Sequence, residues 1–281
     1  MTARRRPQPT LHGVLTGAAL GVLTVLVAFP FYWMVLSSTK SFSELFSIPP
    51  TFWPGAPSWR AYVEVLVTHR FYLHLWNSLR VAAVTVALNV ALATLAAYAL
   101  ARLRFRGKGA ASHALLLIYM LPPILLLVPL FVLLSFLGLR DTLAGLVIAY
   151  LAQTLPVSIY MLGNYFRAIP PEIEESAMVD GCTRLQVIRR VTLPLSLPAL
   201  SGVAVYTFMI AWNEFLFAYI LLDTPRKFTL SKGLYHLFGS YHTAWDVVMA
   251  ASVVMTVPVL LVFLLFQRQL VSGLTAGGVK G

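Results

Sequence analysis

The sequence is poor in charge, and especially in negative charge. Only 11% of its 281 residues are charged and 59% are hydrophobic, whereas a typical soluble domain carries about 25% charged residues. A chain of this composition has too much apolar surface for one soluble core, so we expect a lipid bilayer to surround it. The net charge of +11 does not indicate nucleic acid as a partner, because the basic residues cluster beside apolar runs and no nucleic-acid-binding motif is present.

Residues that carry chemistry are scarce as well. Cys182 is the one cysteine, which excludes an intrachain disulfide. The sequence has no G-x-x-x-x-G-K-S/T pattern, and therefore no phosphate-binding loop of that kind. His236 and His242 do not have the spacing of metal ligands, and the apolar segments contain neither paired acids nor a histidine cluster. We therefore predict no enzyme activity, no bound cofactor and no metal for this chain.

Long hydrophobic runs, in contrast, are abundant. A membrane-spanning helix needs roughly 20 apolar residues, and six segments satisfy this requirement. The second contains Arg80 near its start and the fifth contains Glu214, whereas most of the others are free of charge. We predict a spanning helix over each of 14–36, 75–100, 110–137, 142–165, 197–222 and 247–266.

Prolines interrupt the third and fourth of these segments. Pro122, Pro123 and Pro129 lie in the third, and Pro156 lies in the fourth. Proline removes a backbone hydrogen bond and kinks a helix. The kinks suit a bent, gated pore wall, and the ordinary tolerance of membrane helices for proline explains them equally well.

The basic residues predict the orientation in the membrane. The first span follows Arg4, Arg5 and Arg6, as a signal peptide would, but it is too long and no A-x-A cleavage site follows, which favours a retained anchor. With the N-terminus inside, thirteen basic residues fall on inner segments and seven on outer ones. The positive-inside rule then places both termini in the cytoplasm. The predicted organisation is a cytoplasmic N-terminus (1–13), a six-helix transmembrane domain (14–266) with an inner loop (167–195) and an outer loop (223–246), and a cytoplasmic tail (267–281).

The inner loop 167–195 has its own helical signals. Pro170 and Pro171 end the fourth span and suit the first turn of a new helix. Three glutamates follow in the first turns, where the helix dipole favours anions. Gly181 suits the end of that helix, and a short basic helix over 183–191 can follow. These residues predict a cytoplasmic helix–turn–helix, and by themselves they fit an ordinary amphipathic loop as well as a docking site.

The spacing within this loop resembles the EAA loop of importer-type ABC permeases. The chain reads Glu175-Ser-Ala, three residues, Gly181, nine residues and Val-x-Leu-Pro, against E-A-A-x3-G-x9-I-x-L-P in the family. Ser176 and Val191 depart from the usual Ala and Ile but keep a small or a β-branched side chain. In that family the loop docks on a cytoplasmic ATPase. The resemblance implies the docking residues Glu172, Glu175, Ser176, Ala177, Asp180, Gly181, Leu193 and Pro194.

Two more segments resemble the maltose-type sugar permeases of this group. The tail 267–281 resembles one that reaches into the interface between two ATPases, although a frayed glycine-rich end is the alternative. The outer loop 223–246 resembles one that probes the solute-binding protein, although a plain connection is the alternative. The implied tail contacts are Gly273, Leu274, Thr275, Gly277 and Gly278. The implied loop tip is Gly239, Ser240, Tyr241, His242 and Thr243.

Polar residues inside the spans are candidate substrate contacts. Glu214 lies within an apolar segment, and an intramembrane carboxylate marks a functional site by default. With Trp212 and Asn213 it resembles the sugar-permease pattern, and an aromatic platform beside polar groups suits a sugar. Hydrogen bonding between helices is an equal alternative. Asn77 in the second span is a further pore candidate.

The resemblance implies an all-α membrane protein with the importer-type ABC permease fold and a cytoplasmic coupling helix. Such a subunit forms half of the pore of an ATP-driven, binding-protein-dependent sugar importer in a bacterial or archaeal cytoplasmic membrane. Its expected substrate is an oligosaccharide or a disaccharide such as maltose or trehalose. The implied partners are a second homologous permease, an ATPase dimer that holds ATP and Mg, and an extracytoplasmic sugar-binding protein. The alternative is an ion-coupled secondary transporter that uses Glu214.

Overall fold

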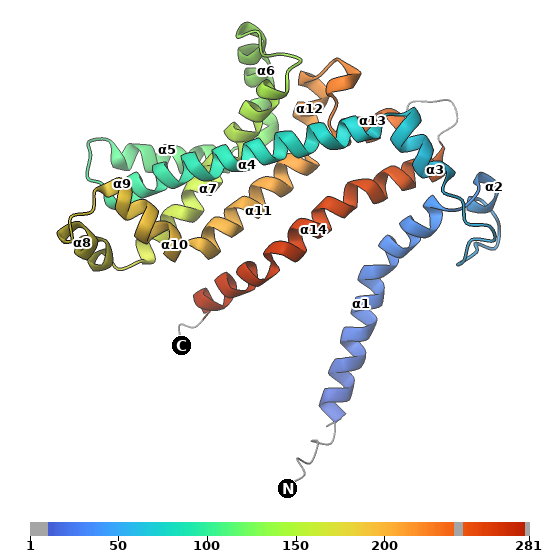
Figure 1. Ribbon diagram of the computed structural model, residues 1–281, viewed down its shortest axis with the longest axis horizontal. Helices are drawn as coiled ribbons and strands as arrows, with labels where there is room; N and C mark the ends of the chain where they lie inside the picture. The colour runs from blue at the N-terminus through green and yellow to red at the C-terminus, as the bar shows by residue number, and fades with distance from the viewer. Residues whose placement is uncertain (1–10, 239–243, 279–281) are drawn as a thin grey trace. The chain divides into compact units, whose positions relative to one another are not determined.

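The computed structural model describes residues 11–238 and 244–278, and within those ranges it contains helices and no strand (Figure 1). The chain divides into two compact units, Met1–His69 with Leu237–Val254 and Arg70–His236 with Met255–Gly281. In the described part, four helices are long and apolar enough to cross a membrane, and two bent helix pairs raise that number to as many as six. The predicted all-α class is confirmed for the described residues, and four to six apolar helices are long enough to span a membrane.

The first unit contains a long apolar helix and a short aromatic segment. Helix α1 (Leu11–Ser38) exposes most of its apolar side chains, which suits contact with lipid. Rings at its end contact the loop that follows, because Tyr32 lies 6.3 Å from Trp53 and Trp33 lies 5.9 Å from Phe52 between ring centroids. The remaining elements are α2 (Phe42–Leu45), α3 (Arg60–Val63), η1 (Glu64–Thr68) and the first part of α14 (Trp245–Gly278).

Three helices form the centre of the second unit. They are α4 (Phe71–Arg102), α7 (Leu143–Ala168) and α11 (Leu197–Asn213). Their shared core contains the small residues Ala93 and Ala97 together with Leu162, Phe166 and Val203, all of them fully buried. Small side chains let membrane helices approach closely, and the larger ones fill the remaining space.

A buried polar network joins the same three helices. Asn89 of α4 donates from Nδ2 to Ser158 Oγ of α7 and to Thr207 Oγ1 of α11, each at 2.7 Å. Thr154 Oγ1 donates to Asn89 Oδ1 at 3.2 Å. All four side chains are fully buried. Because lipid offers no alternative partners, this network fixes the register of the three helices.

Two of the predicted spans are broken. A single helix over 110–137 is wrong, because α5 (Lys108–Met120) is separated from η2 (Pro123–Leu126) and α6 (Leu127–Phe136) by a bend of 104°. The break falls at two consecutive prolines, which have no N–H group to continue the helix. A single helix over 197–222 is also wrong, since α11 ends at Asn213 and α12 (Leu216–Leu221) begins after a two-residue break. The last helix, α14, continues through the predicted boundary at 267 to Gly278.

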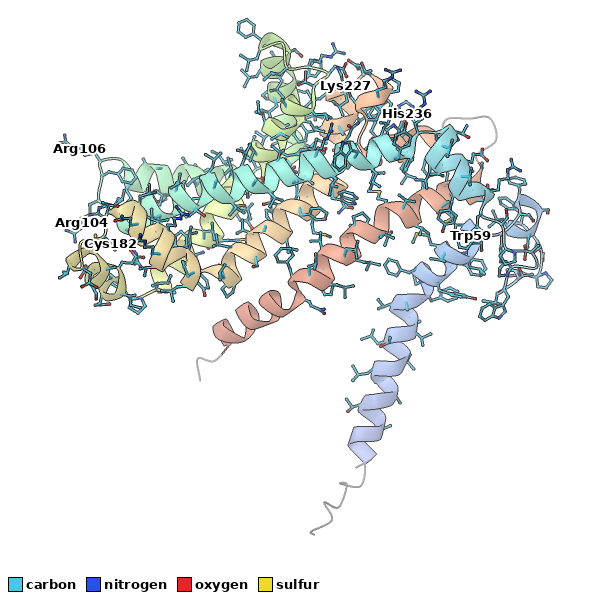
Figure 2. All side chains as sticks on the ribbon, in the orientation of Figure 1. Trp59, Arg104, Arg106, Cys182, Lys227 and His236 are labelled. Atoms are coloured by element: carbon cyan, nitrogen blue, oxygen red, sulfur yellow. The ribbon has the colours of Figure 1, made fainter. Side chains whose placement is uncertain are left out.

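The two ends of the second unit carry the segments that the sequence assigns to opposite sides of the membrane. Arg104 and Arg106 lie at the end that also holds Cys182, and Lys227 and His236 lie far from them (Figure 2). Predicted inner and outer loops are therefore gathered at separate ends, while the orientation in the membrane stays a prediction.

Asp141 joins two loops at the predicted outer end of the second unit. Its Oδ1 accepts the backbone N–H groups of Asp223 (2.8 Å) and Thr224 (3.0 Å), and its Oδ2 accepts Lys227 Nζ (2.9 Å). Burial alone would raise the pKa of the Asp141 carboxyl, but the hydrogen bonds from Thr224, Lys227 and Asp223 outweigh it and hold that pKa well below its usual range. The carboxylate thus links the loop before α7 to η4 (Pro225–Lys227), which precedes α13 (Leu230–Leu237).

Asp141→Asn should lower the stability of the protein by about 1–3 kcal/mol at neutral pH, because it removes a charge-assisted set of hydrogen bonds. Since the folded-state pKa is depressed, the stabilisation is fully present above the unfolded pKa of about 3.9 and is lost as the pH falls below it. Thermal unfolding in detergent from pH 8 to about 2 measures how this difference shrinks below the unfolded pKa. Asp223→Asn is the matched control, because its carboxylate pairs with Arg140 while both side chains are about half exposed. A difference that grows on acidification would contradict this interpretation.

Candidate functional site

The predicted helix–turn–helix is present in the inner loop. Helix α8 (Pro171–Val179) begins at the predicted proline, and α9 (Arg184–Val187) follows and continues through η3 (Ile188–Thr192) into α10 (Leu193–Leu195). Thr183 caps α9 in a reciprocal pair with Gln186, in which each side chain bonds the backbone N–H of the other residue. We call the segment Pro171–Leu195 the docking hairpin.

The turn of the docking hairpin depends on Gly181. Its φ of +88° belongs to the left-handed region, and apart from its chain neighbours nothing lies within 4 Å of the position that a Cβ would occupy. The N–H of Gly181 donates to the carbonyl of Met178 (3.1 Å), and the N–H of Cys182 donates to that of Ala177 (3.0 Å). This is the glycine-dependent helix ending of the Schellman type. A side chain at Gly181 would therefore strain the backbone without a clash.

Glu174 anchors the docking hairpin from inside the protein. It is only 3% exposed. Its Oε2 accepts hydrogen bonds from Arg102 Nε (3.1 Å) and Tyr98 OH (3.2 Å), both on α4, and its Oε1 accepts one from Thr192 Oγ1 (3.0 Å). Arg102 also donates to the carbonyl of Ile169 at 2.7 Å. The buried carboxylate therefore ties α8 to α4 and to η3.

Sequence analysis missed Glu174 because three glutamates stand in four positions. One signal was available, since Glu174, Ala177 and Met178 have the i, i+3, i+4 spacing of one helical face. The structure buries that face wholly or in part. The other face of α8 exposes Glu172, Glu175, Ser176 and Asp180, all of them predicted docking residues.

Apolar side chains accompany these acids on the outer surface of the docking hairpin. Val179 is 88% exposed and Ile173 44%. Acidic and apolar groups that share one exposed surface suit a protein partner with basic and apolar groups. Of the other predicted docking residues, Ala177 and Leu193 are half-buried and Pro194 is exposed.

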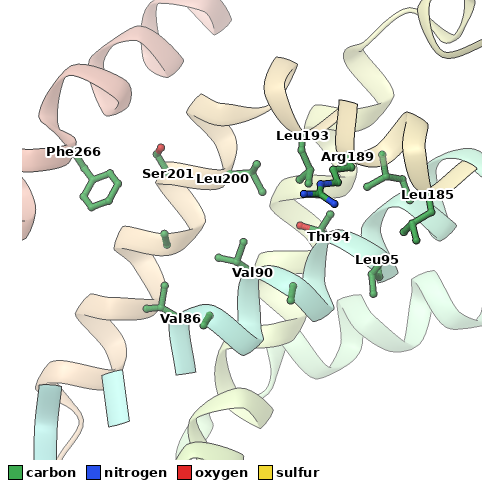
Figure 3. Close-up of a pocket in the computed structure, with 14 residues that line it drawn as sticks. Val86, Val90, Thr94, Leu95, Leu185, Arg189, Leu193, Leu200, Ser201 and Phe266 are labelled. Carbon is green, nitrogen blue, oxygen red and sulfur yellow. The ribbon is translucent and has the colours of Figure 1, made fainter. Parts of the chain in front are cut away.

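A groove runs beside the docking hairpin, between α4 and α11 (Figure 3). Its volume is about 730 Å³. Leu185, Arg189 and Leu193 of the hairpin line it, together with Val90 of α4 and Leu200 of α11. Next to this groove the hairpin packs on the helix bundle through apolar side chains as well as through Glu174, since Ile188 belongs to the same buried core as Ala97 and Leu162 and Leu193 packs against that core.

The candidates around the fifth span occupy different environments. Trp212 is fully buried, and its Nε1 donates to the carbonyl of Met255 at 3.1 Å, so its ring is not available to a sugar in this structure. Asn213 is exposed, with Nδ2 bonded to the Met209 carbonyl at 2.9 Å.

The prediction that Glu214 lies in mid-helix is wrong. Its carboxylate accepts the N–H groups of Phe217 (3.0 Å) and Ala218 (3.3 Å), and it thereby caps the start of α12.

Asn77 is engaged by the outer loop. Its buried Nδ2 donates to the carbonyls of Arg226 (2.8 Å) and Phe228 (3.1 Å), which holds the segment after α12 against α4. A role for Asn77 in the pore stays a prediction. The predicted binding-protein contacts Gly239, Ser240, Tyr241, His242 and Thr243 lie outside the described residues. The tail residues Gly273, Leu274, Thr275, Gly277 and Gly278 lie in α14, and their side chains also lie outside the described part.

Comparison with known proteins identifies the family. Residues 89–275 match the model of the binding-protein-dependent transport system inner membrane component, and the chain belongs to this family. It is 43% identical to the inner membrane ABC transporter permease protein YcjP of Escherichia coli (strain K12), over 97% of this chain and 98% of that protein. It is 37% identical to the trehalose/maltose transport system permease protein MalG of Thermococcus litoralis, over 95% and 96%. The predicted membership of the ABC importer permeases is confirmed.

The fold has a solved counterpart. A bacterial ABC transporter involved in the import of the acidic polysaccharide alginate contains a chain that matches with a TM-score of 0.81 and 23% identity, over 95% of this chain and 99% of that chain. At this identity the match shows the fold alone. The importer-type permease fold is therefore confirmed, and the roles of individual site residues stay predictions.

Removal of the Glu174 side chain should lower the stability of the protein far more than removal of its neighbour Glu175. Glu174→Ala should cost about 3–5 kcal/mol of stability, because Arg102 would keep a buried charge without its carboxylate partner. Glu175→Ala should change stability by less than about 0.5 kcal/mol, as surface substitutions usually do. Chemical denaturation of the purified protein in mixed micelles measures both. Equal effects of the two substitutions would show that the buried ion pair does not anchor the hairpin.

Proposed function

We propose that this protein is the permease subunit of an ATP-driven, binding-protein-dependent sugar importer and forms half of the translocation pore. The observation that carries the proposal is the docking hairpin. The residues that match the EAA pattern lie in this hairpin, and its surface exposes acidic and apolar side chains. The names of several relatives support a sugar as substrate. They include the trehalose/maltose permease MalG, the sulfoquinovosyl glycerol permease SmoH of Agrobacterium fabrum and the diacetylchitobiose permease DasC of Streptomyces coelicolor.

The docking hairpin would couple the partner ATPase to the pore. Glu175 and the exposed apolar residues of α8 contact the ATPase, which binds ATP and Mg. When the ATPase dimer closes, α8 moves with it. The buried bonds of Glu174 to Arg102 and Thr192 then carry this displacement to α4 and η3. Because α4 shares the Asn89 network with α7 and α11, the three helices move together. The pore then closes on one side of the membrane and opens on the other.

The remaining partners follow from the same proposal. A second homologous permease supplies the other half of the pore, and an extracytoplasmic sugar-binding protein delivers the substrate. A related transporter supports this arrangement, since its structure was solved in complex with an alginate pentasaccharide-bound periplasmic protein. We place the loop tip 239–243 against the binding protein and the tail 267–281 at the ATPase interface. A disaccharide such as maltose or trehalose, or a longer oligosaccharide, is the proposed substrate, and the cytoplasmic membrane is the proposed location.

Reconstitution of the complete complex tests the proposal. The protein is coexpressed with its second permease and ATPase, placed in proteoliposomes with the binding protein, and supplied with a panel of radiolabelled maltose, trehalose, diacetylchitobiose and sulfoquinovosyl glycerol. We expect uptake of at least one sugar that requires ATP, the binding protein and Glu175. Uptake by the isolated chain, or uptake that persists without ATP, would overturn the proposal.

Glu214 distinguishes this importer from an ion-coupled carrier. Its carboxylate is used to cap α12, and the glutamine in Glu214→Gln can still accept one of the two N–H bonds. We therefore expect Glu214→Gln to retain at least about half of the ATP-dependent uptake, because one hydrogen bond contributes only about 1 kcal/mol. Dissipation of the proton gradient at constant ATP should leave wild-type uptake intact. Loss of uptake in both experiments would favour a proton-coupled carrier instead.

A further inference from the structure

Helix α7 carries polar side chains on two faces, and only one face is used inside the bundle. Thr154 and Ser158 belong to the buried network around Asn89. The second face carries a row of polar residues separated by seven, four and three positions, a spacing that places them along one side of a helix. These residues, which we call the α7 stripe, are Gln153, Tyr160, Asn164 and Arg167.

Most of the α7 stripe is open to its surroundings. Tyr160 is 45% exposed, Asn164 and Arg167 are exposed, and Gln153 is half-buried. Arg167 donates to Asn164 Oδ1 at 2.6 Å. Polar side chains on a membrane helix face a water-filled space or another protein rather than lipid. Gln153 and Tyr160 therefore mark the side of α7 that does not face the bilayer, and Asn164 and Arg167 continue this side to the predicted inner end of the helix.

A cavity of about 170 Å³ lies at the N-terminal end of the α7 stripe. Gln153 lines it from α7, Tyr119 from the end of α5, and Tyr206 from α11. Within the described residues, Gln153 Oε1 is buried and has no hydrogen-bond partner. An acceptor in this position needs a donor that the described part of the chain does not provide.

Prolines interrupt the helical hydrogen bonding beside the same cavity. Pro156 has no N–H group, so the carbonyl of Ala152 loses the donor that an α-helix normally supplies four residues later. The carbonyl of Tyr119 lies in the last turn of α5, which ends at Met120 before Pro122 and Pro123, and the helix gives it no donor either. Both Tyr119 and Ala152 line the cavity. In a membrane such carbonyls require another donor, and broken helices supply ligand contacts in this way in other transporters.

Acceptors and aromatic rings together suit a carbohydrate. Sugar hydroxyls donate hydrogen bonds, and the C–H faces of a sugar ring pack on aromatic side chains. The rings of Tyr119 and Tyr160 are parallel to within 10°, with centroids 6.1 Å apart, and both side chains are about half exposed. This pair lies between the cavity at Gln153 and the C-terminal part of the stripe.

We propose that the α7 stripe, together with Tyr119 and Tyr206, lines the passage of the sugar, and that Gln153 accepts a hydrogen bond from a sugar hydroxyl at the bend between α5 and α6. Asn213, one of the sequence candidates, lies seven residues from Tyr206 and therefore on the same side of α11. The inference rests on the proposed function, and it assigns substrate contacts to this chain. A second permease subunit that packs tightly over the stripe is the competing arrangement.

Thiol labelling tests whether the α7 stripe faces water. In a Cys182→Ser background, Gln153→Cys and Tyr160→Cys are introduced into the reconstituted complex and exposed to a membrane-impermeant methanethiosulfonate. Ile148→Cys is the matched control, because Ile148 is 40% exposed but lies about 140° around the helix from Gln153. We expect the stripe thiols to react at least about tenfold faster than the control, since an apolar environment suppresses the reactive thiolate. Equal or slower reaction would overturn the inference in favour of lipid or a tightly packed subunit.

Transport kinetics test the role of Gln153. Gln153→Leu should raise the KM for radiolabelled maltose or trehalose roughly three- to tenfold, as the loss of one hydrogen bond predicts, without changing the amount of complex in the membrane. Gln153→Asn should recover part of the affinity, and Ile148→Leu should behave as wild type. An unchanged KM in Gln153→Leu would overturn the assignment. Absence of uptake in the wild type would instead contradict the proposed function, while thiol labelling still decides whether the stripe faces water.

Discussion

A polar group inside a lipid bilayer must find its partner within the protein, and most of this structure follows from that constraint. Asn89 satisfies its amide with three hydroxyls on neighbouring helices. Asn77 bonds two loop carbonyls, and Glu214 bonds the free N–H groups at the start of α12. Each of these residues sets the position of a helix or a loop. The cavity at Gln153 differs, because it holds a buried amide oxygen, Gln153 Oε1, for which the described residues offer no donor.

Burial inside the protein acts on the docking hairpin in the same way as lipid does on the spans, and it explains how the hairpin can transmit movement. An exposed ion pair would be screened by water and would contribute little. The pair between Arg102 and Glu174 is enclosed, and it is supported by Tyr98 and Thr192. Removal of either charge leaves the other without compensation, so the hairpin and α4 are expected to move as one body. The exposed side of α8, one residue away at Glu175, remains free for contact with another protein.

Helix breaks give the bundle the places at which it can bend. The prolines between α5 and η2, and the two-residue break between α11 and α12, both interrupt helices that lipid would otherwise favour as continuous. Continuous helices satisfy their own backbone, whereas broken ones leave backbone groups that other atoms must satisfy. Glu214 does this at one break, and we assign the corresponding role at the other break to the transported sugar. Structural and functional polar groups thus differ in where their partner comes from.

Composition and hydropathy alone determined that the chain is a helical membrane protein. With 59% hydrophobic residues it has too much apolar surface for a soluble core, so lipid must surround it. Spacing alone located the docking hairpin, since Pro171, Gly181 and Thr183 act through local backbone chemistry that needs no distant contact. The tertiary structure separated Glu174 from Glu175, because burial depends on α4, a helix far away in the sequence, and helical spacing alone does not tell which face of α8 packs against it. It also reassigned Trp212 and Glu214, whose neighbours and helix ends cannot be read from hydropathy. The roles of side chains within the bundle were decided by packing between segments, which no local pattern encodes.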